Sequence, residues 1–474
     1  MTFSVGKIML SKVVLIFIVT TILFAFLPFV QSGAGLTYVL IAFVLFSIAL
    51  LVFCKKNVDL FEPLTWLLIM SSLFYIFSII ICFLDFGFLY HDNFSTRDDR
   101  FEFLFYAVAL FTLGLMFFIL GDFVADSFCF KFNSAPGFRL YLNKDLSLLL
   151  GGGLIALGGL NFAVNSYAYN STDLLMLLKD FGARNHRIQD GVFYSTLGYN
   201  FLISGLFFLM YRRVFFFKSL GVLYKCIFVA SLVVLLSTGR IWYTVSLVFV
   251  FLGLAHFSGM QVKLRSMMIY CVALCFAVLS IYFIRLYSNL SYINSEDAFG
   301  SNLISDFSSK VVEFIFGRSN VPSVPILMEV IDLFSGGQDF YAGKTLFYWL
   351  SYFIPGYDVT FLGHEIKERL YPGRPGGFPP TVFGEFYANG GVFFVVLASL
   401  YLGFISKLFY VYTIQVKSFL LYFIYSAILF RFIFMLPKLE MSALGSAVWL
   451  FLPTVLLCVL LRLLVLGCSG KANA

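Results

Sequence analysis

The stretch VVLIFIVTTILFAFLPFV, residues 13–30, decides the fold class together with LTYVLIAFVLFSIALLVF at residues 36–53. Neither stretch contains a charged side chain. A helix needs about 20 mostly apolar residues to cross the hydrocarbon core of a bilayer, and both stretches approach that length. The sequence therefore predicts an all-α polytopic membrane protein.

The composition of the whole chain agrees with this prediction. Of 474 residues, 61% are hydrophobic and only 12% are charged, and the mean hydropathy is +0.95. Soluble domains carry about 25% charged residues. A soluble enzyme, a secreted disulfide scaffold and a disordered chain are therefore excluded. The net charge of +7 does not indicate nucleic-acid binding, because the basic residues are scattered over the loops instead of forming one patch.

Apolar segments of membrane-spanning length recur along the chain. The pattern predicts about twelve transmembrane helices, at residues 13–30, 36–54, 63–84, 101–120, 146–166, 193–211, 219–237, 241–257, 266–285, 391–408, 418–436 and 444–464. The chain then divides into three parts. Residues 1–285 carry helices 1–9 with short loops, 286–391 form a large outer loop, and 392–474 carry helices 10–12.

The basic residues give the orientation. Placing the N-terminus in the cytoplasm puts 17 of the 32 Lys and Arg residues on the inner side, but only five of the 25 Asp and Glu residues. Short cytoplasmic loops carry an excess of Lys and Arg. Both termini are therefore predicted to be cytoplasmic. No cysteine falls in an outer loop, so no disulfide framework is expected there.

The segment between Leu286 and Gly391 is unusually long for a loop and is expected to be functional. Apolar residues recur in it at helical spacing over 303–315 and again over 326–334. The apolar segment Thr345–Ile354 is too short to cross a membrane. These patterns predict helices that lie in the membrane interface or re-enter the protein, forming a lid over the outer mouth of the bundle.

Basic side chains gather on the outer side, and the guanidinium groups suggest a ligand. A guanidinium presents a rigid fork of donors that matches phosphate or pyrophosphate oxygens, and it stays charged when partly buried. The alternative for each arginine is an ordinary contact with lipid headgroups. The candidate pyrophosphate-binding or substrate-binding residues are Arg184, Arg187, Arg240, Arg285, Arg318, Arg374 and Tyr371.

Glu385 and His364 are the candidate acid–base residues. Glu385 is a lone carboxylate between aromatic residues, just before the predicted span at 391–408, and partial desolvation there suits a general base. An ion pair with a nearby arginine is the alternative. His364 and Glu365 do not form an HExxH motif, because position 368 is glutamate. No metal site or cofactor is expected.

Four short motifs, in this order and topology, resemble the bacterial oligosaccharide repeat-unit polymerases, the Wzy-type O-antigen and enterobacterial common antigen polymerases. They are STGR at Ser237–Arg240, FIRLY at Phe283–Tyr287, YPGRP at Tyr371–Pro375 and PPTVFGEFYANGG at Pro379–Gly391. Some family members carry an arginine and a glycine separated by ten residues in each of two outer loops. Arg187 and Gly198 have this spacing, whereas Arg374 and Gly384 have nine residues between them.

The resemblance implies a membrane glycosyltransferase of GT-C-type architecture in the bacterial inner membrane, with its active site on the periplasmic side. Such an enzyme moves a growing glycan from one undecaprenyl-pyrophosphate carrier onto a lipid-linked repeat unit. Its implied partners are undecaprenyl-pyrophosphate-linked oligosaccharides and membrane lipids, with a chain-length regulator and a flippase, and no nucleic acid. Direct attack by the acceptor hydroxyl, without a metal, predicts inversion at the anomeric carbon.

Two other functions remain open at this point. A lipid-linked oligosaccharide flippase or transporter suits twelve spans, but transporters gather polar groups near the bilayer midplane. An O-antigen ligase is a sister enzyme of similar topology, and the GEFYANGG segment favours the polymerase. The outer-loop aromatics also have two interpretations, stacking on sugar rings or forming an interfacial belt; these are Tyr341, Tyr348, Trp349, Tyr352 and Tyr357.

Overall fold

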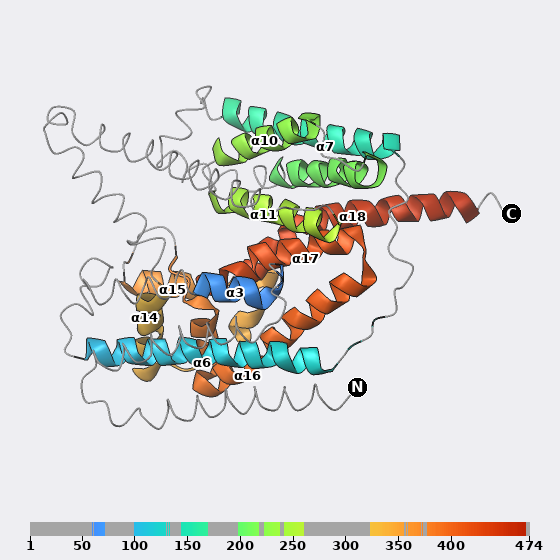
Figure 1. Ribbon diagram of the computed structural model, residues 1–474. Helices are drawn as coiled ribbons and strands as arrows, with labels where there is room; N and C mark the ends of the chain where they lie inside the picture. The colour runs from blue at the N-terminus through green and yellow to red at the C-terminus, as the bar shows by residue number, and fades with distance from the viewer. Residues whose placement is uncertain are drawn as a thin grey trace, which may run out of the picture. The chain divides into compact units, whose positions relative to one another are not determined.

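A computed structural model gives the architecture (Figure 1). It describes residues 59, 61–71, 99–128, 130, 132, 144–168, 198–217, 222–237, 241–259, 323–354, 357, 359–370, 372 and 377–470. Every regular element within these ranges is helical. The all-α prediction is therefore confirmed for the described part of the chain.

Four of the described helices are long and apolar enough to cross a membrane. They are α6 (Arg100–Ser127), α7 (Lys144–Ala168), α16 (Thr381–Val416) and α18 (Ala443–Gly470). Three shorter apolar helices coincide with predicted spans: α10 (Val222–Ser237), α11 (Ile241–Phe257) and α17 (Phe419–Arg431). The count of twelve spans and the GT-C arrangement stay predictions, because the spans at 13–30, 36–54 and 266–285 lie outside the described residues.

The chain forms two compact units that cut across the three sequence blocks. The first takes the described residues within Met1–Phe132, Ile304–Gln415 and Arg431–Ser446, and the second takes those within Asn133–Leu303, Val416–Phe430 and Ala447–Ala474. The described part of the predicted lid, residues 323–391 with its gaps, thus belongs to the same unit as α6 and most of α16.

Two glycines let α6 and α16 approach closely in the first unit. A Cβ atom added to Gly121 would lie 2.0 Å from the carbonyl oxygen of Leu400, and one added to Gly403 would lie 2.0 Å from that of Phe118. The two backbones are therefore in direct contact, as small residues allow between membrane helices. Helix α3 (Pro63–Ser71) belongs to this unit and contacts the 3₁₀ turn at Ile433–Met435.

Three short helical elements form the described part of the lid. Helix α14 (Ser323–Ser335) packs on α6 (Figure 1), and it confirms the helical pattern predicted at 326–334. The apolar segment at 345–354 forms a tighter 3₁₀ helix, η5 (Lys344–Tyr352). Helix α15 (Leu362–Leu370) was not expected. It forms because Leu362 and Ile366, four residues apart, bury one face in a core shared with α14 and α16.

Helix α16 begins at Thr381, well before the predicted start of the span at residue 391. The Thr381 hydroxyl accepts a hydrogen bond from the Gly384 N–H at 3.1 Å, which satisfies one of the free donors of the first turn. The helix is interrupted at Gly390 and Gly391. Gly391 has φ 68° and ψ −159°, a conformation essentially restricted to glycine. Glu385 consequently lies in a helix and not in the loop before it.

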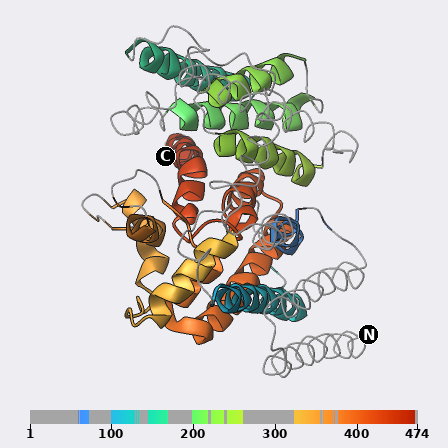
Figure 2. The same ribbon diagram turned by 90° about the vertical axis from the view of Figure 1, so that its left-hand side faces the viewer.

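The second unit contains α7, a helix at 198–212, α10, α11, α17 and most of α18. Helix α10 contacts α11, and Figures 1 and 2 show α7, the helix at 198–212, α10 and α11 in one stack. Small residues again allow close packing, since an added Cβ at Gly205 would lie 2.8 Å from the Gly151 carbonyl oxygen. The Ser204 and Thr454 hydroxyls hydrogen-bond at 2.7 Å in the buried interior.

Candidate functional site

Glu385 lies one turn into α16 and is only 2% exposed. Its carboxylate accepts a hydrogen bond from the backbone N–H of Met441, which follows α17 in the chain, and another from the side chain of Thr345 in η5. These described partners are neutral donors and not an arginine. The carboxylate is therefore held where the lid, the start of α16 and the turn before α18 meet.

A second buried carboxylate, Glu440, faces Glu385 closely enough for the two charges to repel. One oxygen of Glu440 accepts the N–H of Gly363 at 3.2 Å, and the other accepts the hydroxyl of Ser442 at 3.1 Å. Burial raises the pKa of Glu440 above its ordinary value, and the two hydrogen bonds oppose that shift. Two like charges in a buried site cannot both be ionised without a large cost, so the pair favours sharing a proton.

Asn389 organises the surroundings of Glu385. Its side-chain oxygen accepts the Gly343 N–H at 2.9 Å, while its nitrogen donates to the Thr345 hydroxyl at 2.6 Å and to the Glu385 carbonyl at 2.7 Å. Nearby, the Tyr341 N–H donates to the Ala388 carbonyl at 3.0 Å, in the turn just before the helix break. The first residues of η5 are thus bonded directly to the first turns of α16.

Aromatic rings continue from this site toward solvent. Phe361 stacks on Tyr352 with ring centroids 5.9 Å apart, and it contacts Tyr348 and His364 at 6.4 and 6.0 Å. Tyr352 is 42% exposed. Burial raises the pKa of the Tyr348 hydroxyl, and the charges of Tyr357, Glu365 and Glu385 raise it further. Tyr348 therefore connects the exposed rings with the buried carboxylate.

A polar cluster of three side chains lies beside these rings. The Tyr341 hydroxyl donates to one oxygen of Glu365, and the Gln338 amide donates to the other at 3.0 Å. The Gln338 amide also approaches the Tyr341 hydroxyl at 3.4 Å. All three side chains are half-buried. Their hydroxyl, amide and carboxylate groups can therefore both accept and donate hydrogen bonds to a hydroxyl-rich ligand at the surface.

The structure separates the two candidate acid–base residues. Glu385 is buried, whereas His364 is exposed on α15 and contacts Phe361 with its ring. The sequence prediction of a partly desolvated carboxylate underestimated the burial of Glu385, because η5 covers it. It missed Glu440 altogether, since a lone glutamate between two predicted spans carries no pattern. The predicted substrate-binding residues lie outside the described residues: Arg184, Arg187, Arg240, Arg285, Arg318, Arg374 and Tyr371.

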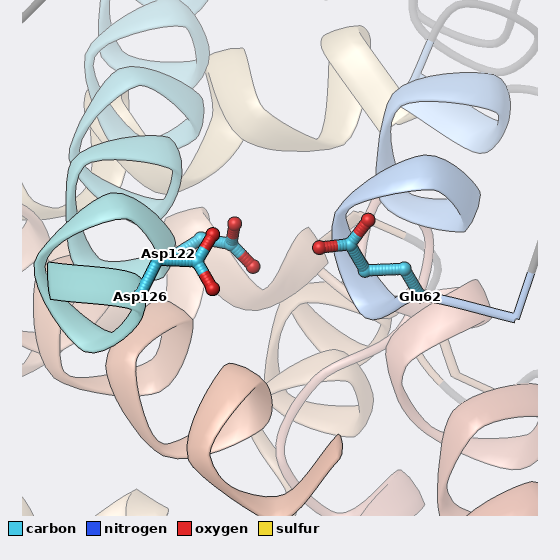
Figure 3. A group of neighbouring side chains, drawn as sticks. All are labelled: Glu62, Asp122 and Asp126. Carbon is cyan, nitrogen blue, oxygen red and sulfur yellow. The ribbon is translucent and has the colours of Figure 1, made fainter. Parts of the chain in front are cut away.

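Another acidic cluster lies in the first unit, at the start of α3 and the end of α6. The carboxylate oxygens of Glu62, Asp122 and Asp126 lie within 4.8 Å of one another and point toward a common centre (Figure 3). Such a cluster is a possible cation site, but the ammonium of Lys407 already bonds Glu62 and approaches Asp126 to 2.9 Å. The cluster is thus a buried ion-pair network with its own cation. In the sequence, these three acids count only among the five predicted to lie on the inner side.

No family profile, curated protein sequence or solved structure matches this chain. The resemblance to the repeat-unit polymerases therefore rests on the sequence motifs and on the predicted topology.

Proposed function

We propose that this protein is a membrane glycosyltransferase that polymerises undecaprenyl-pyrophosphate-linked oligosaccharide repeat units at the periplasmic face of a bacterial inner membrane. The observation that carries the proposal is the buried Glu385, placed by the PPTVFGEFYANGG segment at the start of an apolar helix and beneath the lid. A carboxylate facing a second one, with its proton affinity altered by burial, is typical of general acid–base sites.

Glu385 is assigned as the general base that takes the proton from the acceptor sugar hydroxyl. The proton is transferred to its carboxylate as the hydroxyl oxygen bonds to the anomeric carbon of the donor glycan and the bond to the carrier pyrophosphate breaks. A sugar hydroxyl is a weak nucleophile, so a positioned base contributes about 10²–10⁴-fold to the rate. His364, exposed on the neighbouring helix, is the alternative base.

The arginines of the outer loops are assigned to the departing lipid pyrophosphate, whose growing negative charge they stabilise. Arg240 and Arg285 are the first choices, because they end predicted spans at the outer side. The exposed Tyr352 ring and the polar cluster of Gln338, Tyr341 and Glu365 supply stacking and hydrogen-bonding groups for sugars. No metal or cofactor takes part in this scheme.

Complementation of a strain that lacks its repeat-unit polymerase tests the proposal. The wild-type gene should restore a ladder of glycan lengths on a gel, whereas Glu385→Ala and Glu385→Gln should give only single repeat units. Arg240→Ala and Arg285→Ala should do the same. Glu102→Gln is the matched control, because Glu102 is an exposed acid in the first turn of another helix. Membrane levels of each variant are measured by immunoblot.

Three results would contradict the polymerase assignment. If both Glu385 variants gave the same ladder as the wild type, Glu385 would not be the general base. Long glycans that accumulate on the carrier and fail to reach lipid A, in a strain lacking only this gene, would identify an O-antigen ligase instead. Loss of repeat units from the outer face, measured on intact cells, would identify a flippase.

A further inference from the structure

The side chain of Asn389 stands at the junction between the lid and Glu385. It is 2% exposed and lies directly before the glycine break in α16. Its amide oxygen has one described donor, the Gly343 N–H, and its amide nitrogen has two described acceptors, the Thr345 hydroxyl and the Glu385 carbonyl. A backbone N–H only donates and a backbone carbonyl only accepts, so these partners fix the orientation of the amide.

The orientation of the amide determines that of the Thr345 hydroxyl. Because this hydroxyl accepts the proton of the Asn389 amide, its own proton is directed elsewhere, and the Glu385 carboxylate is its partner. Thr345 is 1% exposed, so water does not compete for the bond. Asn389, Thr345 and Glu385 thus form a directed chain of hydrogen bonds.

The same amide also fixes the entry to η5. Ala342 and Gly343 both have positive φ, at 50° and 87°. A non-glycine residue with positive φ is uncommon and persists where surrounding contacts hold it. Those contacts are the Asn389 bond to the Gly343 N–H and the Ala388 bond to the Tyr341 N–H.

We infer that Asn389 is a positioning residue for Glu385. The Asn389 amide holds the lid residues 341–345 against α16 and directs the Thr345 hydroxyl toward the Glu385 carboxylate. The inference rests on the proposed function for the role of Glu385 as a base. Without the amide, the turn separates from α16, and the carboxylate loses a donor that fixes its direction toward the acceptor hydroxyl.

A labelling experiment on the full-length protein tests the structural part of this inference. In a background without the eight native cysteines, Thr345→Cys should react slowly with a maleimide. Adding Asn389→Ala should speed this reaction about tenfold or more, because each lost hydrogen bond weakens the closed arrangement several-fold. Ser335→Cys is exposed and should react quickly in both backgrounds.

Gln415→Ala is the matched control for this substitution. Gln415 is a second side-chain amide on α16 that bonds a neighbouring segment, accepting the Phe132 N–H at 2.6 Å and donating to the Phe130 carbonyl at 2.8 Å. Its loss should leave the labelling of Thr345→Cys unchanged. If Thr345→Cys reacted with the maleimide at the same rate with and without Asn389→Ala, the inference would be overturned.

Kinetics of glycan elongation by purified protein test the positioning part. Thr345→Val and Asn389→Ala should each lower kcat about tenfold or more, while KM changes by less than about twofold, because orientation of the base matters only in the transition state. Thr345→Ser keeps the hydroxyl and should recover most of kcat.

A Thr345→Ser variant as slow as Thr345→Val would show that packing and not the hydroxyl matters, and would contradict the inference. An inactive wild type would contradict the proposed function alone, since labelling still decides the role of Asn389.

Discussion

Lys407 and Glu62 lie 345 residues apart in the chain and form an ion pair in which both side chains are almost fully buried. The same ammonium also contacts Asp126, and Asp122 lies beside it. One cation thus links α3, α6 and α16. Removing one partner of a buried ion pair costs far more than the pair itself contributes, because the remaining charges stay buried.

Lys407→Met should therefore destabilise the protein by about 3–5 kcal/mol, since three carboxylates would face one another without their central cation. Thermal unfolding in detergent, followed by tryptophan fluorescence, measures the loss. Lys417→Met is the control, because Lys417 is exposed just beyond the end of α16 and should change stability little. Adding Glu62→Gln to Lys407→Met should recover part of the loss, and a further decrease would contradict the network.

Glu440→Gln should flatten the pH dependence of stability. Burial raises the pKa of Glu440 in the folded protein, so the folded state holds its proton more tightly than the unfolded state. The stability that this proton supplies is present at low pH and decreases as the pH rises above the ordinary value of 4.5. Glu385, Ser442 and the Gly363 N–H face this carboxyl group, and a glutamine can keep the latter two bonds.

The measurement for Glu440 is the unfolding temperature over a pH series that begins near 4.5 and continues to neutral pH. The unfolding temperature of Glu440→Gln should increase relative to that of the wild type as the pH rises. Asp339→Asn is the control, since that side chain is exposed and its replacement should change stability little over the same series. If the Glu440→Gln curve ran parallel to that of the wild type, the ionisation of Glu440 would not contribute to the pH dependence of stability, and the prediction would be wrong.

Gly391→Ala should destabilise the protein by about 1–3 kcal/mol, because φ 68° with ψ −159° is strained for any residue with a Cβ. Gly390→Ala is a sharp control in the same break. Its φ of 177° is extended backbone that any residue adopts, and the atoms nearest to an added Cβ belong to the Phe394 side chain, at 3.1 Å and beyond. Equal unfolding temperatures for the two variants would argue against the observed break.

Gly121→Ala and Gly159→Ala should have opposite effects, although both glycines lie within long helices. At Gly121 the new Cβ would lie 2.0 Å from the Leu400 carbonyl oxygen, so α6 and α16 must separate. At Gly159 no atom lies within 4 Å, and alanine gains about 1 kcal/mol of helix propensity. The yield of monodisperse protein after heating measures both effects.

The fold class was readable from the sequence because a bilayer imposes a length and a polarity on each helix. The described α6, α7 and α18 extend past the predicted spans at 101–120, 146–166 and 444–464 by a few residues. The start of α16 was not readable in this way. Its first turns carry Glu385 and Asn389 and follow two prolines, so an apolar window begins only after Gly391. The Thr381 cap and bonds to the lid stabilise those turns.

The candidate site was only partly predictable. Glu385 was identifiable because a lone carboxylate among aromatic residues before a span is unusual. Its partners Glu440 and Thr345 were not, since 55 and 40 residues separate them from it and neither follows a periodic pattern. The surroundings of His364 were not readable from the sequence either. A histidine near the site in sequence turned out to lie on the exposed face of α15.

The sequence by itself determined that this chain is helical and apolar enough for a membrane, because hydropathy and length act residue by residue along the chain. Only the tertiary structure decided which of the few charged side chains meet. Lys407 with Glu62, and Glu385 with Glu440, are brought together by helix packing over long separations. A buried charge must find a partner in space, and a one-dimensional pattern contains no information about that partner.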